Sequence, residues 1–255
     1  MSKVTVSSLK QKKSENRKIT CLTAYDATTA SLIDSAGIDI VLVGDSLGSA
    51  VLGYENTLPV TFGDMLHHLK AVRRGVKNAL LVCDMPLSSF SSRDSAVNDA
   101  LNLVSSGAEA VKIEGMEHLD VIKDLVKRGV RVMGHLGFTP QSDDHPSLKG
   151  KDPDGSLRLI DNALSLCEAG TFSIVLELVE KNTAQKLSKS VPVPTIGIGS
   201  GPYCDGQVLV VNDVIGLTLG RVPKLAKQYA DVKSVIFSAV NKYKEEVENL
   251  DYPQA

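Results

Sequence analysis

The chain has 255 residues, and its 28 Lys and Arg residues nearly balance its 30 Asp and Glu residues, for a formal net charge of −2. This balance, with no Trp and 4% aromatic residues, gives no reason to expect nucleic acid or a membrane surface as a partner. Four cysteines without metal-ligand spacing, a polar N-terminus without a signal sequence and no apolar run near ~18 residues indicate a reduced cytoplasmic protein without a membrane span.

The first half of the chain alternates between short apolar strands and helices. Residues 1–18 form an N-terminal segment, in which 4–13 predict a short helix that caps the bottom of a barrel. The expected strands are 19–23, 38–43, 79–84 and 110–114, and the expected helices are 27–36, 62–74, 93–106 and 116–128. Residues 47–61 form a loop longer than ~12 residues, a length that often indicates function, and Thr61 is the expected N-cap of the next helix.

The second half of the chain continues the alternation. Strands are expected at 130–136, 172–178 and 194–198, with the last strand at 208–211 or 214–217, and helices at 156–169, 183–190 and 234–249. Residues 137–155 are polar and rich in Pro and Gly, which predicts a second long loop. The last helix is amphipathic and is expected to end the fold.

This order of elements indicates the fold class. Eight alternations of a short strand and a helix, with glycines after the helices, predict a single (β/α)8 TIM barrel of the α/β class. Residues 1–255 are expected to form one domain, with 19–255 as the barrel. A doubly wound open sheet is the alternative.

Ionisable side chains stand at the positions where the apolar strands end. Asp45, Asp84 and Glu114 end the second, third and fourth predicted strands, which are neighbours in a barrel. Carboxylates that converge at the C-terminal rim repel one another unless a cation lies between them. Oxygen ligands suit a hard cation, so we expect Mg²⁺ held by one or two carboxylates, with water and substrate completing the octahedron.

Two of these carboxylates also have a structural interpretation. Asp45 precedes Ser46 and is compatible with a helix N-cap or a turn, and Asp84 is compatible with a turn before Met85. Either interpretation is as good as a metal ligand when the residue is taken alone. The recurrence on three consecutive strands favours the metal site.

Lys112 lies two residues before Glu114 in the same predicted strand. The alternation of a strand places both side chains on one face, opposite the apolar Val111 and Ile113. A lysine inside a barrel is costly unless it is paired. Lys112 is therefore either one half of a structural ion pair with Glu114 or an ammonium group that binds an anionic substrate beside the metal.

Two further strands end in His135 and Glu177. His135 is interpreted either as a hydrogen-bonded core residue or as a general base that competes with Glu177. Glu177 has apolar neighbours on both sides, and desolvation there favours a general base or acid. Glu180 lies just past that strand and predicts a solvated loop charge. The glycine-rich residues 197–201 are compatible with a phosphate loop or with close backbone approach at the rim.

Several runs of residues are specific enough to indicate a family. Two of them are highly specific, Val-Gly-Asp-Ser-Leu-Gly at 43–48 and Gly-His-Leu-Gly-Phe-Thr-Pro-Gln-Ser at 134–142. The others, in chain order, are Thr-Ala-Tyr-Asp at 23–26, Thr-Leu-Pro-Val-Thr at 57–61, Asp-Met-Pro at 84–86, Val-Lys-Ile-Glu-Gly at 111–115, Val-Leu-Glu at 175–177, Ile-Gly-Ile-Gly at 196–199 and Asp-Gly-Gln at 205–207. Over nearly its whole length the chain thus resembles the ketopantoate hydroxymethyltransferase family, although residues 143–151 are shorter and less glycine-rich than the usual loop.

This resemblance implies a barrel of the phosphoenolpyruvate/pyruvate-binding superfamily. It implies transfer of a hydroxymethyl group from 5,10-methylenetetrahydrofolate, the co-substrate, to 3-methyl-2-oxobutanoate, which gives 2-dehydropantoate for pantothenate and coenzyme A. It also implies a homo-oligomer, because members of the family are often decamers.

The resemblance implies roles for individual residues as well. The Mg²⁺ ligands of the family match Asp45 and Asp84, with Glu114 close or bound through water. The proton acceptor of the family matches Glu177. The positions that contact the substrate match Asp45, Ser46, Asp84, Lys112 and His135.

Two other functions are compatible with a barrel of this kind. A carbon–carbon lyase or mutase of the same superfamily would act on a 2-oxo acid or a phosphoenolpyruvate-like substrate. Such lyases commonly carry a reactive cysteine in the loop after the third strand, and residues 85–92 contain none. An oligomeric scaffold without activity would not need rim carboxylates, given their electrostatic cost. We therefore expect the hydroxymethyltransferase.

Overall fold

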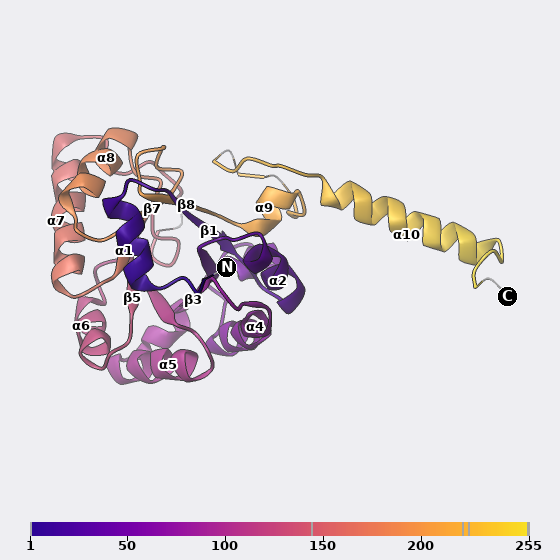
Figure 1. Cartoon of the computed structure of the whole chain (residues 1–255), viewed down its shortest axis with the longest axis horizontal. Coiled ribbons are helices and arrows are strands. Elements are labelled where there is room, and N and C mark those ends of the chain that lie inside the picture. The colour runs from indigo at the N-terminus through magenta and orange to yellow at the C-terminus, as the bar shows by residue number, and fades with distance from the viewer. Residues whose placement is uncertain (1, 144, 221, 224, 254–255) are drawn as a thin grey trace.

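The computed structural model describes residues 2–143, 145–220, 222–223 and 225–253. Eight parallel strands pair in chain order and close into a barrel, so the predicted fold class is confirmed and the open sheet is wrong (Figure 1). The strands are β1 (Ile19–Thr23), β2 (Ile40–Val43), β3 (Leu80–Asp84), β4 (Ala110–Glu114), β5 (Val132–Gly137), β6 (Ser173–Glu177), β7 (Thr195–Ile198) and β8 (Gly206–Leu209).

Helices surround most of the barrel. Thr61 caps α4 as predicted, because its hydroxyl accepts from the backbone N–H of Asp64 while the Asp64 carboxylate accepts in return from the Thr61 N–H. The helices are α1 (Val6–Ser14), α2 (Ala27–Ser35), α3 (Leu47–Ala50), α4 (Phe62–Gly75), the 3₁₀ helix η1 (Leu87–Ser91), α5 (Arg93–Ser105), α6 (Leu119–Lys127), α7 (Pro153–Glu168), α8 (Lys181–Ser190), α9 (Val211–Ile215) and α10 (Val232–Glu248).

Two apolar layers hold the barrel together, one on each face of the sheet. Outward-facing side chains such as Val41, Leu81 and Val111 pack against the helices in one buried cluster. Inward-facing side chains such as Ile40 and Leu80 form a separate cluster inside the barrel. Strands β2 and β3 are buried on both faces, which explains why they read as apolar runs in the sequence, whereas β4 is equally buried but carries Lys112 and Glu114 on its inner face.

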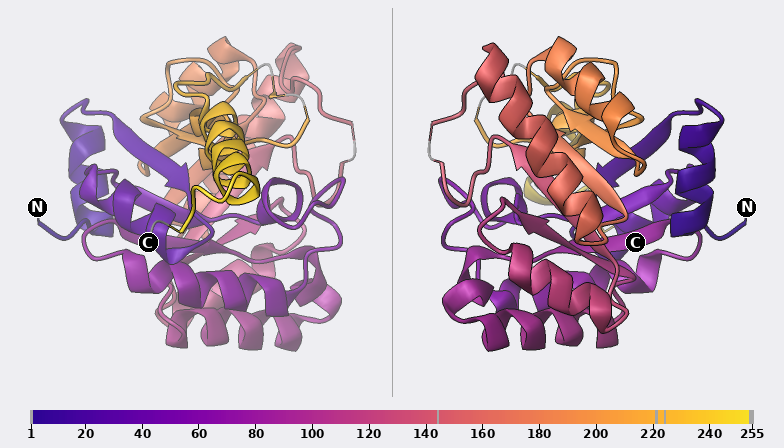
Figure 2. Two further views of the ribbon diagram at one scale, coloured as in Figure 1. Left: turned by 90° about the vertical axis from the view of Figure 1, so that its right-hand side faces the viewer. Right: turned by 90° about the vertical axis from the view of Figure 1, so that its left-hand side faces the viewer.

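The N-terminal segment lies at the end of the barrel where the strands begin, opposite the rim loops (Figure 2). Leu9 of α1 is fully buried and belongs to the cluster inside the barrel. Lysines of this segment bind carboxylates close to the strand starts, in the ion pairs Lys3–Glu109, Lys12–Asp39 and Lys13–Asp205. Leu9, together with the partly buried Val4 and Val6, and the surrounding ion pairs therefore close this end, which leaves the opposite rim for chemistry.

Some expected boundaries are wrong. Helix α7 begins at Pro153, earlier than predicted, because Asp152 accepts from the Gly155 N–H as N-cap and proline suits the first turn. The last strand is β8, so the alternative placement at 214–217 is wrong, since 211–215 form α9. The loop 47–61 contains the short helix α3.

Helix α10 does not pack on the barrel in the way expected of a last barrel helix. It extends away from the other elements, and each of its residues is at least partly exposed (Figure 1). The outer face of β1 and β8 is consequently left without a covering helix in the described part of the chain. Among the described residues, no helix combines the length and the apolar character needed to cross a membrane.

Candidate active site

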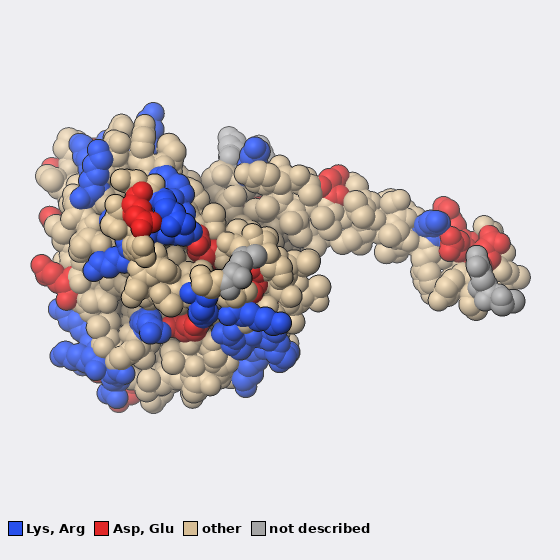
Figure 3. Space-filling view, in the orientation of Figure 1, with Lys and Arg blue, Asp and Glu red and all other residues tan. Residues whose placement is uncertain are grey.

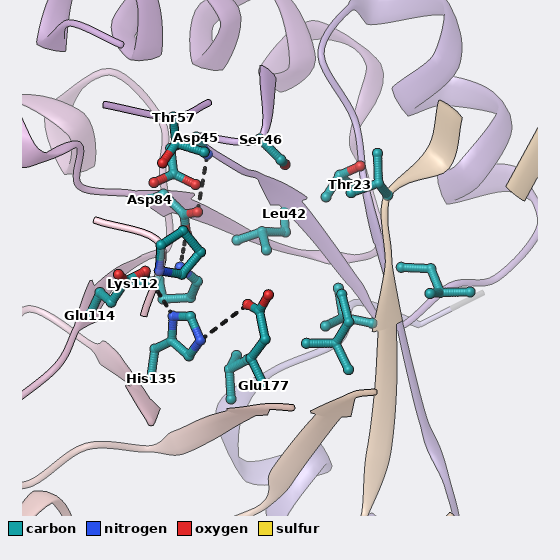
Figure 4. Close-up of a pocket in the computed structure, with 16 residues that line it drawn as sticks. Thr23, Leu42, Asp45, Ser46, Thr57, Asp84, Lys112, Glu114, His135 and Glu177 are labelled. Atoms are coloured by element: carbon teal, nitrogen blue, oxygen red, sulfur yellow. Dashed lines mark hydrogen bonds and ion pairs between the residues drawn. The ribbon is translucent and has the colours of Figure 1, made fainter. Parts of the chain in front are cut away.

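A cavity of about 130 Å³ opens at the C-terminal rim of the barrel (Figure 4). It is lined by the ends of several strands and by residues of the rim loops. Every site residue predicted from the sequence lines it, namely Asp45, Ser46, Asp84, Lys112, Glu114, His135 and Glu177. The side chains meet because each lies near the carboxyl end of a parallel strand or just after it, and parallel strands present these ends at one rim. The strand expected to end at His135 continues to Gly137.

Asp45, Asp84 and Lys112 form a charged group on one side of the cavity. The Asp45 N–H donates to Oδ2 of Asp84 at 3.1 Å, and Oδ1 of Asp84 lies 3.0 Å from Nζ of Lys112. The proposed structural pair of Lys112 with Glu114 is therefore wrong, because Lys112 pairs with Asp84. The strand register explains this, since Asp84 and Lys112 are cross-strand neighbours. The carboxylate of Asp45 does not cap a helix either, because it accepts from Gln141.

These charges shift one another strongly. Burial raises the pKa of Asp45 to about 7, and the neighbouring Asp84 carboxylate adds to the effect. Burial alone would lower the pKa of Lys112, but the carboxylates of Asp84, Asp45 and Glu114 outweigh it and raise that pKa. The ammonium group is thus charged at neutral pH and compensates part of the negative charge.

His135 lies between two carboxylates, beside Lys112 and on the neighbouring strand (Figure 4). Its Nδ1 is 3.1 Å from Oε2 of Glu114, and its Nε2 is 3.3 Å from Oε2 of Glu177. Burial and the charge of Lys112 lower the pKa of His135, but the two carboxylates outweigh them and raise it to about 9. The Glu177 side chain is one-fifth exposed, so it is less desolvated than its apolar sequence neighbours suggest.

The donor set fits a divalent cation that is held by two carboxylates. Among the described residues, no three His, Cys, Asp or Glu side chains are grouped so that they could hold a metal ion together. Oδ1 of Asp84 is buried and faces the Lys112 ammonium at 3.0 Å, but it has no hydrogen bond by geometry in the described part of the chain. Both oxygens of Glu114 are engaged, by the Gln141 N–H and by His135. Mg²⁺ commonly takes one or two carboxylates plus water and substrate, so Asp45 and Asp84 would suffice.

Gly44 shapes the rim beside these carboxylates. A Cβ at this position would lie 2.7 Å from the Ser46 hydroxyl and 3.6 Å from Oδ2 of Asp84. The missing side chain therefore lets the Ser46 hydroxyl lie close to the backbone of Gly44. The Ser46 hydroxyl is in turn 2.9 Å from the buried hydroxyl of Tyr25, which orients it.

Sequence reasoning assigned no role to three polar residues that bear on the site, of which only one, Thr57, lines the cavity while the other two contact lining residues. They are Tyr25, Thr57, whose buried hydroxyl has no hydrogen-bond partner among the described residues, and Gln141. All three lie in runs that resemble the family, which was the available signal. The sequence of a loop does not predict which strand end each of its residues contacts.

The glycine-rich residues 197–201 serve packing. The Ser200 hydroxyl donates to the carbonyl of Leu176 and accepts from the Val179 N–H. Gly199 has φ of +66°, and a Cβ there would lie 2.9 Å from the Leu178 side chain. Close backbone approach therefore explains these glycines. Glu180, expected to be a solvated charge, caps α8 by accepting from the N–H groups of Asn182 and Thr183.

Comparison with known sequences connects this cavity to a family. A family profile described as "Ketopantoate hydroxymethyltransferase" matches residues 3–255. A protein of Thermoanaerobacter sp. (strain X514) called 3-methyl-2-oxobutanoate hydroxymethyltransferase is 46% identical over 98% of this chain and 94% of its own length. A protein of the same name from Caldicellulosiruptor saccharolyticus is 49% identical, over 99% of this chain and 98% of its own.

Solved structures share the barrel at much lower identity. Phosphonopyruvate hydrolase in complex with oxalate and Mg²⁺ is similar with a TM-score of 0.61 and 15% identity, over 98% of this chain and 87% of that one. The 2,3-dimethylmalate lyase described as a member of the PEP mutase/isocitrate lyase superfamily has a TM-score of 0.60 and 12% identity, over 98% and 89%. These similarities concern the fold alone, a closed parallel barrel.

Proposed function

Because the chain belongs to the ketopantoate hydroxymethyltransferase family, we propose that it transfers a hydroxymethyl group from 5,10-methylenetetrahydrofolate to 3-methyl-2-oxobutanoate, giving 2-dehydropantoate. The chain is a transferase of pantothenate biosynthesis, as its relatives are. The observation that supports the proposed chemistry is one cavity that collects two carboxylates for a cation, a paired ammonium group and a separate carboxylate.

The charged side of the cavity would bind the keto acid. Asp45 and Asp84 would hold Mg²⁺, with Glu114 close to the ion or bound to it through water. When bound, Mg²⁺ would supply a Lewis acid that stabilises negative charge on the keto acid and its enolate. The Lys112 ammonium offsets the charge of the substrate carboxylate, and the Ser46 hydroxyl donates a hydrogen bond to it.

Glu177 is the proposed base that removes the proton from C3 of the keto acid. It reaches the cavity from the side opposite Ser46, away from the carboxylates assigned to the cation (Figure 4). His135 carries a proton at neutral pH and cannot accept a second one, which favours Glu177 in this role. The imidazolium instead orients the Glu177 carboxylate through the contact at Nε2.

The size of the cavity separates the two substrates. A volume of about 130 Å³ suits a small organic acid, so the much larger folate must approach from the mouth. The long rim loops at 47–61 and 138–152 would then contact the folate.

The cysteines Cys21, Cys83, Cys167 and Cys204 are free thiols, which agrees with the cytoplasmic location that we propose.

One assay tests the reaction. The purified chain should form 2-dehydropantoate from the two substrates when Mg²⁺ is present and lose this activity in chelator. Asp45→Ala and Asp84→Ala should lose Mg²⁺-dependent binding of the keto acid by calorimetry while their circular dichroism stays that of the wild type. Cleavage of 2-oxo acids without any transfer would instead indicate a lyase.

We also propose a homo-oligomer in which partners cover the open face of the barrel with α10. A groove of about 750 Å³ runs along β1 and β8 and continues past Leu225 and Tyr229. Along these two strands the outward-facing Thr20 and Gln207 are exposed, and Leu22 is half-buried. The groove thus lies where a barrel helix would normally pack.

Helix α10 carries the complementary apolar surface. Ile236, Val240, Tyr243 and Val247 recur at spacings of four, three and four residues and form one stripe, each 40–59% exposed. The middle of α10 shows few charged side chains in the face of Figure 3. Among the described residues, the groove and the apolar stripe of α10 do not contact each other within one chain. This arrangement favours a dimer contact in which α10 of each copy packs into the groove of the other copy.

Light scattering tests this assembly. The wild type should have the mass of an oligomer, and Val240→Asp should dissociate it, whereas Glu245→Ala on the same helix should not. An assembled Val240→Asp variant would contradict this packing of α10. A monomeric wild type would indicate that α10 folds back onto its own groove.

A further inference from the structure

Gln141 joins the loop after β5 to the ends of three other strands. Its side-chain amide donates to Oδ2 of Asp45 at 2.8 Å and to the carbonyl of Met85 at 3.0 Å. Its backbone N–H donates to Oε1 of Glu114 at 2.7 Å. Asp45, Met85 and Glu114 follow or end β2, β3 and β4. One residue of a loop therefore contacts the rim of three neighbouring strands.

These contacts determine which carboxylate oxygens stay available. The amide NH₂ has two protons, and Asp45 and Met85 take one each. Asp45 is held at Oδ2, which leaves Oδ1 for a ligand. Glu114 is held at Oε1, while its Oε2 faces His135. Gln141 thereby orients both carboxylates before a ligand binds. Hydrogen-bond partners of metal ligands commonly have this role.

A simpler role would be to anchor the loop, but the loop has other anchors. The Phe138 N–H donates to the Glu177 carbonyl at 2.8 Å, and the Lys149 N–H donates to the Leu178 carbonyl at 2.7 Å. The Ser142 hydroxyl donates to Thr139 at 2.8 Å and closes a local turn. Gln141 differs from all of these because two of its three partners are rim carboxylates.

We propose that Gln141 is a positioning residue that orients Asp45 for the divalent cation and couples the loop at 138–152 to cation binding. The inference rests on the proposed function, in which Asp45 is a cation ligand. The side chain of Gln141 would then set the affinity of the rim carboxylates for the cation.

The variant Gln141→Met tests this role, because methionine has nearly the same length and no donor. The dissociation constant for Mn²⁺, measured on the whole chain without substrate by electron paramagnetic resonance, should rise about 10–100-fold. At saturating cation, kcat should return to near the wild-type value while the half-saturating cation concentration stays high. Gln141→Ala removes the same donors and should show the same loss. Ser142→Ala, which removes the hydroxyl contact to Thr139 but touches no carboxylate, should bind Mn²⁺ like the wild type.

The outcomes separate this inference from the function on which it rests. Unchanged Mn²⁺ affinity in both Gln141 variants, with a wild type that binds the ion, overturns the positioning role alone. Faster hydrogen exchange in the loop at unchanged affinity also overturns it, since Gln141 would then be an anchor only. A wild type that binds no divalent cation overturns the cation part of the proposed function and this inference with it.

Discussion

Glu177 and His135 form an ion pair across the ends of β5 and β6, with Oε2 of Glu177 3.3 Å from Nε2 of His135. The other ring nitrogen faces Glu114, which is the cross-strand neighbour of His135. An imidazolium between two carboxylates is a donor on both sides and has no lone pair for a substrate proton. This arrangement supports the assignment of the proton acceptor to Glu177 and gives His135 an orienting role.

Glu177→Gln should therefore abolish proton removal while keeping substrate binding. We expect exchange of the C3 proton of 3-methyl-2-oxobutanoate with deuterated water to slow by about 10²–10⁴-fold, the usual contribution of a general base. The measurement is proton NMR with Mg²⁺ present and no folate. His135→Gln is the matched comparison, and calorimetry should show keto acid binding in both variants. If Glu177→Gln exchanges at the wild-type rate while His135→Gln does not, the base is His135.

Lys112→Met should weaken binding of the keto acid and slow turnover together. The ammonium group is buried beside Asp84 and faces the cavity, so its loss removes charge that stabilises both the substrate and the enolate. We expect kcat/KM to fall by about 10²–10³-fold, as for removal of one preorganised donor. Lys123→Met on the exposed face of α6 is the control. Lost thermal stability with normal kinetics in the folded fraction would mean that Lys112 serves the ion pair alone.

The fold and the convergence of the candidate site residues in one cavity were predictable from the sequence for the same reason. An apolar run that stops at a carboxylate marks both a barrel strand and its functional end, as at Asp84 and Glu114, the last residues of β3 and β4. The two-residue alternation also predicted correctly that Lys112 and Glu114 share the inner face. The local pattern of the sequence was therefore enough to predict which residues end the strands and which face of the strand their side chains occupy.

Contacts between elements could not be predicted in this way. The partner of Lys112 depends on the register that aligns it with Asp84, and register is a property of two strands. Gln141 reaches Asp45 through the path of a whole loop. The position of α10 depends on where its apolar stripe finds a surface, and an amphipathic pattern alone does not say on which copy of the chain that surface lies.

Asp45→Asn should raise the free energy of unfolding of the metal-free protein, by a large amount at pH 8 and by a much smaller amount at pH 5. The pKa of Asp45 rises from its ordinary 3.8 to about 7 on folding, so the folded state keeps a proton that the unfolded state releases. That proton uptake favours folding at low pH, and the advantage disappears as the pH rises through about 7. Asparagine has no charge to bury. Urea unfolding in chelator at both pH values measures the difference in free energy of unfolding between the variant and the wild type. An equal difference at pH 5 and pH 8 would show that the charge of Asp45 does not destabilise the folded state.

Tyr25→Phe should weaken keto acid binding only when Ser46 is present. The two hydroxyl oxygens are 2.9 Å apart, and Tyr25 is buried, so the contact orients the Ser46 hydroxyl toward the cavity. A hydrogen bond of this kind contributes about 0.5–1.5 kcal/mol, which corresponds to a rise in KM of roughly 2–13-fold. A double-mutant cycle with Ser46→Ala separates this from a packing effect, because phenylalanine keeps the ring. We expect the double variant to bind no more weakly than Ser46→Ala alone. Fully additive losses would mean that Tyr25 acts on the site without Ser46.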